Sequence, residues 1–194
     1  MKVLNMTAQA HDHVVFNKEY FSIVGVAGGP LVTPEQFGMK GESWSTDLYR
    51  GFYANYELTK SGLFLNELRI IMMERKYLPI DGVLPEKATG DNEFAYPTYR
   101  NLKVPVPFTG QIRLARDFIG ECYVHMGFQS PTAFRTVYDL TLENGRMVKL
   151  KDRSKDMEKK RNRGVLGRTF RSLLRIIKRE NSISKSFTLD MDKE

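Results

Sequence analysis

The stretch that decides the fold is YRGFYANYELTKSGLFLNELRIIMM, which runs from Tyr49 to Met73. Its first part is typical of a β-strand, because one face of an extended chain would carry Phe52, Ala54, Tyr56 and Leu58. Lys-Ser-Gly at 60–62 predicts a short reversal. The apolar run 63–73 is then most simply the antiparallel partner of the first strand.

Further strands are predicted on both sides of this pair. β-Branched and aromatic residues are enriched in five more segments, which are 14–16, 20–27, 102–108, 121–128 and 134–143. Pro105 and Pro107 keep their segment out of the centre of a sheet. Asn144-Gly145 predicts a tight hairpin, since both residues tolerate positive φ. We therefore expect a mainly β fold, a single antiparallel sandwich or half-barrel, over residues 1–150.

Charge is unevenly distributed along the 194 residues, whose formal net charge is +7. Residues 1–148 hold 15 basic and 16 acidic side chains, whereas residues 149–185 hold 14 basic and 4 acidic ones. The final segment, 186–194, holds one basic and three acidic side chains. This asymmetry indicates an anionic partner, or a solvated arm, for the basic part.

The basic part is expected to contain a helix. We interpret residues 151–164 as a polar linker, 165–180 as a basic amphipathic helix and 181–194 as a flexible tail. At 100° per residue one face of the helix is apolar and the opposite face cationic. The residues predicted to contact a partner are Arg168, Phe170, Arg171, Leu174, Arg175, Ile177, Lys178 and Arg179.

Four surfaces could receive this helix. It could dock its apolar face on the β domain or in a groove of a protein partner. It could also lie on an anionic membrane surface, although Phe170 is its only aromatic residue. Nucleic acid is the fourth, with salt-dependent affinity for the phosphate backbone. The helix lacks interleaved aromatic residues for base stacking, which argues against sequence readout. Docking on protein is the favoured interpretation.

Candidate chemistry in the β domain is sparse. His11 and His13 would share one face of a strand, but two imidazoles without a third ligand do not make a metal site, and none is predicted. In the predicted strand 121–128, Cys122 and His125 would point to opposite faces. We interpret Cys122 as a core residue and His125 as a hydrogen-bonded structural or binding residue.

A body site is predicted around Arg50, Glu57, Tyr123 and His125, and no cofactor is predicted. Arg50 precedes the cleanest strand, where it could pair with Glu57 or a nearby Asp, or be a strand-end charge. The glycine-rich residues 25–29 lack the spacing of a phosphate-binding loop. With a single cysteine, the chain forms no intramolecular disulfide.

Two motifs carry a resemblance. One is Trp44-Ser-Thr followed by Tyr49-Arg-Gly-Phe and Tyr56-Glu-Leu, and the other is Tyr-Val-His-Met-Gly-Phe at 123–128. Together they resemble a pattern in a group of small bacterial proteins for which no activity is established. The resemblance brackets about residues 44–150, leaves out the basic segment and implies no catalytic or binding role.

These observations favour a non-enzymatic protein-interaction module, with the basic segment contacting a protein partner. Small bacterial modules of this kind often serve defence or toxin–immunity systems, and a similar role for this chain is a hypothesis by association with them. The alternatives are a nucleic-acid-associated subunit and an enzyme of unknown class centred on His125. The first residues lack the apolar run of a secretory signal, so we expect a cytoplasmic protein.

Overall fold

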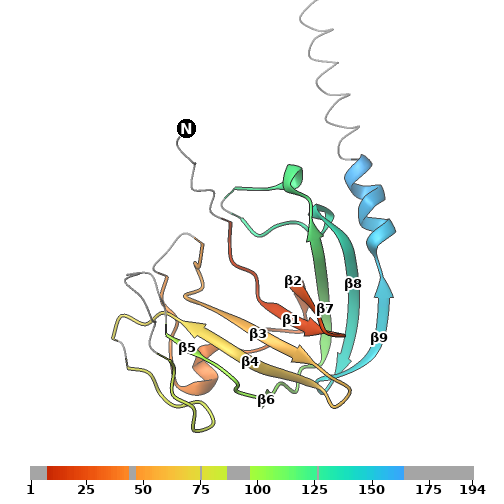
Figure 1. Ribbon diagram of the computed structural model, residues 1–194. Helices are drawn as coiled ribbons and strands as arrows, with labels where there is room; N and C mark the ends of the chain where they lie inside the picture. Colours follow the sequence, from red (N-terminus) through yellow and green to blue (C-terminus); the bar gives the residue numbers. More distant parts are fainter. Residues whose placement is uncertain (1–7, 44–46, 75, 87–96, 126, 164–194) are drawn as a thin grey trace, which may run out of the picture.

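The computed structural model describes residues 8–43, 47–74, 76–86, 97–125 and 127–163. Within these residues nine strands form one sheet and a single α-helix covers 154–163, which confirms the mainly β prediction (Figure 1). The strands are β1 (His13–Phe16), β2 (Glu19–Ala27), β3 (Phe52–Leu58), β4 (Leu63–Ile70), β5 (Thr98–Tyr99), β6 (Val104–Pro105), β7 (Gly110–Phe118), β8 (Phe134–Glu143) and β9 (Arg146–Asp152). Three short 3-10 turns are η1 (Pro34–Phe37), η2 (Gly120–Cys122) and η3 (Pro131–Ala133).

The sheet order is β5-β4-β3-β1-β2-β7-β8-β9, with β6 paired to β4. Neighbouring strands are antiparallel except for β1 and β3, which run parallel from His13 opposite Asn55 to Phe16 opposite Leu58. This parallel pair joins the β3–β4 hairpin to the β1–β2 hairpin. Two locally formed units therefore become one sheet.

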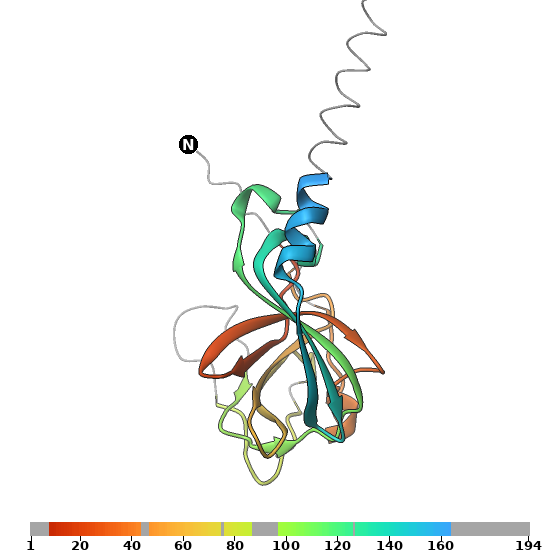
Figure 2. The same ribbon diagram turned by 90° about the vertical axis from the view of Figure 1, so that its right-hand side faces the viewer.

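The sheet curls around its own apolar face as an open half-barrel, which Figure 2 shows from the side. At one end the β8–β9 turn reaches the start of β4, where Leu63 N–H donates to the Gly145 carbonyl at 2.8 Å. Gly145 N–H in turn donates to the Phe108 carbonyl at 2.8 Å. The largest side chains enclosed in the curl are Tyr56, Tyr99, Phe21, Leu63, Leu65, Leu68, Ile70, Ile80, Ile112, Leu114, Leu140 and Leu142.

Local sequence signals placed the two clearest hairpins correctly. In β3 the alternation is confirmed, since Ala54, Tyr56 and Leu58 are buried and Glu57 is exposed. Asn144 and Gly145 both have positive φ, 47° and 79°, as the predicted β8–β9 turn requires. The proline-containing strand β6 pairs on one side with β4, which agrees with its predicted place off the centre of the sheet.

The predicted strand over 121–128 is wrong. Residues 120–122 form η2, and the chain then loops back to η3. The Gln129 side chain holds this loop, because its amide oxygen accepts from Val124 N–H at 2.8 Å and its amide nitrogen donates to the Val124 carbonyl at 2.7 Å. A side chain that satisfies the backbone replaces a strand partner here.

The polar linker predicted over 151–164 is also not seen in the described residues 151–163. β9 continues to Asp152, and the α-helix begins at Ser154. Met157, the main apolar residue of this stretch, is 3% exposed and packs with Ala133, Phe134 and Val137. Met157 is thus a buried apolar anchor for a helix whose other residues are mostly polar.

The predicted basic helix 165–180 and tail 181–194, with all eight partner-contact residues named for the helix, lie outside the described residues. Trp44 and Met126, which belong to the motifs quoted above, lie outside them as well.

Gly51, at the entry to β3, offers a test of the fold. Its φ is +72°, and an added Cβ would collide with the backbone of Glu42 and Gly41. We expect Gly51→Ala to lower the free energy of unfolding by about 3 kcal/mol or more, from the positive φ and the collision together. Gly82 is the matched control, because its φ is +78° in open space. Urea titration should give a loss of only about 1 kcal/mol for Gly82→Ala; equal losses would contradict the packing described here.

Candidate interaction surface

β9 is an edge strand, paired on one side with β8 and ending the order of the sheet in the described part of the chain. All seven of its residues are exposed. Three of them are large and apolar: Met147 is 40% exposed, Val148 53% and Leu150 43%. An edge strand presents unpaired backbone N–H and C=O groups, which can pair with a strand of another chain.

The register with β8 separates the two faces of β9. Met147 lies opposite Leu142 and Leu150 opposite Leu140, and both leucines are fully buried. Met147 and Leu150 therefore lie on the core face, at the rim of the apolar interior. On the other face Lys149 lies opposite Thr141 and Lys151 opposite Asp139. The edge thus has one apolar and one cationic face.

The helix that follows β9 continues this surface above the sheet (Figures 1 and 2). It rests beside the loop that carries η3, where an Arg161 guanidinium N–H donates to the Thr132 carbonyl at 2.6 Å and the Phe134 carbonyl at 3.1 Å. Together with Met157, this contact fixes the helix against the end of β8.

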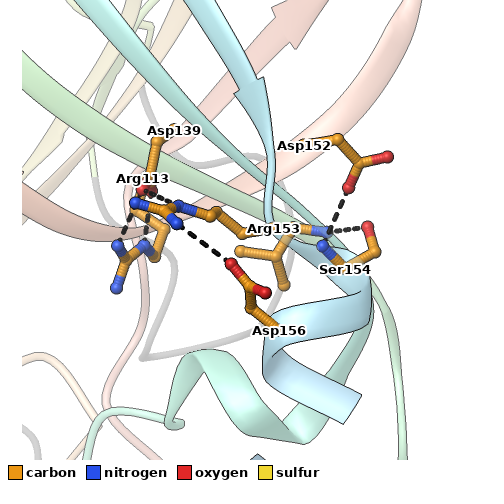
Figure 3. Close-up of polar contacts among 7 residues, drawn as sticks. Arg113, Asp139, Asp152, Arg153, Ser154 and Asp156 are labelled. Carbon is orange, nitrogen blue, oxygen red and sulfur yellow. Dashed lines mark hydrogen bonds and ion pairs between the residues drawn. The ribbon is translucent and has the colours of Figure 1, made fainter. Parts of the chain in front are cut away.

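Asp139 ties the sheet to the helix. Its Oδ1 accepts from Arg113 Nε at 2.6 Å, and its Oδ2 accepts from Arg113 Nη2 and Arg153 Nε, each at 2.9 Å. Arg153 also donates to Asp156 in the first turn of the helix at 3.0 Å (Figure 3). The two hydrogen bonds from Arg113, and then the one from Arg153, hold the pKa of Asp139 below its ordinary value.

Two further contacts set where the helix begins. Asp152 Oδ1 accepts from Ser154 N–H at 2.8 Å, as Figure 3 shows, and Ser154 Oγ accepts from Val137 N–H at 3.1 Å. The hydrogen bonds from Ser154 lower the pKa of Asp152. Arg153 N–H donates to the Val137 carbonyl at 2.8 Å, so β8 continues to pair with the chain as it leaves β9.

This surface is strongly basic. Residues 146–163 contain nine basic and three acidic side chains. Arg153 and Arg161 are engaged by the contacts above. The other seven basic side chains are exposed, and they are Arg146, Lys149, Lys151, Lys155, Lys159, Lys160 and Arg163. We call β9 and the exposed side of helix 154–163 the β9 surface. Its chemistry favours an acidic ligand with apolar side chains.

The four residues of the predicted body site lie in different environments. Arg50 forms a bidentate pair with Asp12, at 3.1 and 2.8 Å, and its guanidinium lies over the Phe52 ring at 4.8 Å. Glu57 is exposed on β3. Among the described residues, no hydrogen bond or ion pair joins these four. The partner of Arg50 is thus Asp12 and not Glu57, and Asp12 is close in space although it lies 38 residues away in the sequence.

The loop residues of that site differ from one another as well. His125 is exposed on a turn, whereas the Tyr123 hydroxyl is buried and has no hydrogen-bond partner among the described residues. Cys122, which we interpreted as a core residue, is only partly buried and packs against the edge of the cluster around Met157. Nothing in this geometry presents His125 and Cys122 as a base and nucleophile pair.

His11 joins the N-terminal segment to the 123–130 loop. Its Nδ1–H donates to the Ile23 carbonyl at 3.2 Å, and its Nε2 accepts from Gln129 N–H at 3.3 Å. The carbonyl can only accept and the amide can only donate, so this arrangement requires the neutral ring. Burial lowers the pKa of His11; Asp12 opposes that shift, and Arg50 adds to it.

His13 directly follows Asp12 in the sequence, and its ring contacts different residues from those of His11. Its ring stacks on Tyr20 with centroids 4.7 Å apart, and burial lowers its pKa, with a smaller contribution from His11. In the described part of the chain, no group of three or more His, Cys, Asp or Glu side chains could hold a metal ion. Likewise, no described helix has the length and apolar character needed to cross a membrane.

A cavity of about 390 Å³ lies between η1 and the chain around β6. Its walls are apolar side chains, glycine, the Gln36 amide and Thr109, and none of them titrates. They are Gly28, Pro30, Leu31, Val32, Gln36, Phe37, Val104, Pro105, Val106, Pro107, Phe108 and Thr109. The cavity offers no acid–base pair for a reaction.

Asp139→Asn tests how the β9 surface is held. The amide keeps the shape but loses the charge that two arginines bind, so we expect the free energy of unfolding to fall by about 1.5–3 kcal/mol. Glu19→Gln is the control, because Glu19 is an exposed carboxylate that pairs with a single arginine, Arg116, and its effect should stay below about 1 kcal/mol. Hydrogen exchange should show the Met157 amide less protected in Asp139→Asn only; unchanged protection would contradict this anchoring role.

The histidines predict a dependence of stability on pH. Because the pKa values of His11 and His13 are lowered in the folded state, the unfolded chain takes up protons first as the pH falls. The free energy of unfolding should therefore decrease below about pH 6.5, the ordinary histidine pKa. Denaturant unfolding between pH 8 and pH 5 should show a smaller decrease for His11→Gln, and a smaller one still when His13→Gln is added.

His125→Gln is the control for this titration, since His125 is the remaining histidine of the chain and is exposed. It should keep the full pH dependence of the unaltered protein. A decrease that disappears with His125→Gln instead would show that the wrong histidines have been assigned.

Comparison with protein-family models, curated proteins and solved structures finds no match to this chain.

Proposed function

We propose that this protein is an interaction module that binds an acidic, extended segment of a protein partner along the β9 surface. The observation that carries the proposal is the edge itself, a seven-residue strand with every residue exposed, three of them large and apolar. Extended segments bind such edges by adding a strand, with backbone hydrogen bonds for affinity and side-chain contacts for specificity.

The charges of the edge select the partner. Lysines on an edge strand discourage two copies of the same sheet from pairing, since like charges would meet. The same lysines attract a strand that carries Asp or Glu on the corresponding face. Apolar side chains on the other face of that strand would cover Met147 and Leu150. The predicted basic helix 165–180 would add to this contact.

Nucleic acid is the competing ligand, because the β9 surface carries seven exposed basic side chains. Three exposed acidic residues, Asp152, Asp156 and Glu158, interrupt it. The exposed Met147, Val148 and Leu150 add area that a phosphate backbone would not use. These features favour protein over nucleic acid. A cytoplasmic location and a part in a bacterial defence or toxin–immunity system remain sequence predictions.

Co-purification from the native host at low and high salt tests the proposal. The bait is the full chain, compared with Lys149→Glu/Lys151→Glu. Lys40→Glu/Lys76→Glu is the matched control, because it makes the same charge change at exposed positions away from β9. We expect a partner that co-purifies with the full chain and with the control. The affinity of the β9 variant for this partner should be at least about tenfold lower, which corresponds to about 1.4 kcal/mol of binding free energy.

Two outcomes would overturn the proposal. One is retention that is equal for the β9 variant and the control. The other is retention that nuclease treatment abolishes, which would favour the nucleic-acid alternative. A partner that survives nuclease and is released by salt supports the acidic protein ligand.

A further inference from the structure

The sequence contains a segment whose pattern matches the β9 surface. Residues 187–192, Phe-Thr-Leu-Asp-Met-Asp, lie outside the described part of the chain. In an extended conformation Phe187, Leu189 and Met191 would share one face, and Thr188, Asp190 and Asp192 the other. This segment is therefore apolar on one face and acidic on the other.

We propose that segment 187–192 of this chain adds to the sheet as a further strand beside β9 of the same molecule. The core face of β9 offers Met147 and Leu150, and the opposite face offers Lys149 and Lys151. A strand laid beside β9 alternates with the same period of two. It can therefore place its apolar side chains on the rim of the core and its aspartates beside the lysines.

The size of the segment fits the edge. Its six residues would span about 20 Å, close to the roughly 23 Å of the seven residues of β9. Twenty-three residues, 164–186, connect it to the end of the described helix. The ten residues of helix 154–163 rise only about 15 Å. Fully extended, the connection reaches about 75 Å or more, so the segment can return to β9.

The predicted helix 165–180 sets a condition on this return. If it continued straight from residue 163, the few residues after it would be too short to reach back. Docking of segment 187–192 therefore requires the chain to reverse between residue 163 and the predicted helix. Gly164 stands at that place, and glycine is the residue that most often ends a helix.

The intramolecular arrangement is favoured over an exchange between two copies. A tethered segment competes with an effective concentration in the millimolar range, well above that of a second molecule in dilute solution. Two copies joined edge to edge through β9 would instead place Lys149 and Lys151 near their counterparts. The acidic segment avoids this repulsion.

Docking of this segment would regulate the partner site. This consequence rests on the proposed function, because an occupied edge cannot accept an external strand. The partner and the segment would then compete for the same backbone groups. The docking itself does not depend on any partner, and it can be tested with the isolated full chain.

Hydrogen exchange with mass-spectrometric detection is the test. A strand beside β9 protects the amides that point away from β8. Leu189→Pro removes an amide and cannot form a strand ladder, so peptides covering residues 146–152 should exchange at least about tenfold faster at those amides. Ser182→Pro, outside the segment, is the control and should leave the exchange unchanged. Exchange of β9 that is the same in all three proteins would overturn the docking.

Charge exchange gives a second, independent readout. Asp190→Lys/Asp192→Lys should increase exchange in β9 as Leu189→Pro does. Adding Lys149→Glu/Lys151→Glu should restore the protection, because the two faces are again complementary. Failure of the combined variant to regain protection would contradict the assigned pairing of aspartates with lysines.

The oligomeric state distinguishes the source of the strand. The full chain should be monomeric at the concentration of the exchange experiment, by light scattering. A dimer that Leu189→Pro dissociates would overturn the intramolecular assignment. The two proposals also fail separately. If the hydrogen exchange of β9 is the same with and without Leu189→Pro, the docking of segment 187–192 is wrong. If a partner is retained equally by Lys149→Glu/Lys151→Glu and by the full chain, the proposed function is wrong.

Discussion

A single sheet that has to cover its own apolar face must curl, and the rest of the described structure follows from that constraint. The large buried side chains come from β5 at one end of the sheet order, from the middle strands, and from β8, the neighbour of β9 at the other end. Curling brings β4 to the β8–β9 turn, where backbone hydrogen bonds from Leu63 and Gly145 hold the two ends near each other. It does not carry β9 itself into the interior. The half-barrel therefore ends in a strand that is paired but not covered.

Asp139 fixes the start of the helix at the end of that uncovered edge. It lies on the outer face of β8 and binds arginines from β7 and from the residue that precedes the helix. A carboxylate with several charge-assisted hydrogen bonds holds its partners in one geometry, and Arg113 matches it in a bidentate way. The orientation of the helix is thus set by the sheet. A surface that is fixed in shape can recognise a ligand with a smaller loss of conformational entropy on binding.

The chemistry of the β9 surface disfavours pairing between two copies of the exposed edge. Lysines on one face repel a second copy of the edge, while the apolar face remains open at the rim of the core. The lysines therefore select for an acidic strand as well as disfavouring a second copy of β9. An acidic strand, which we propose comes from a partner or from residues 187–192, would be attracted to one face and would cover apolar area on the other.

Local signals in the sequence determined the hairpins. Alternation in 52–58 and the Asn144-Gly145 turn act over a few residues, so they could be predicted without knowledge of the rest of the chain. The division of charge between a neutral β domain and a basic segment was also evident from the sequence alone. Only the tertiary structure decided the parallel pairing of β1 with β3, the Arg50–Asp12 pair and the role of Gln129 in the 121–128 loop. The first two join parts of the chain that are far apart in the sequence, and the third depends on a side-chain geometry of Gln129 that the alternation of residues does not specify. The β9 surface was missed for the same reason: exposure of Met147, Val148 and Leu150 depends on where the curl ends, and that is a property of the whole sheet.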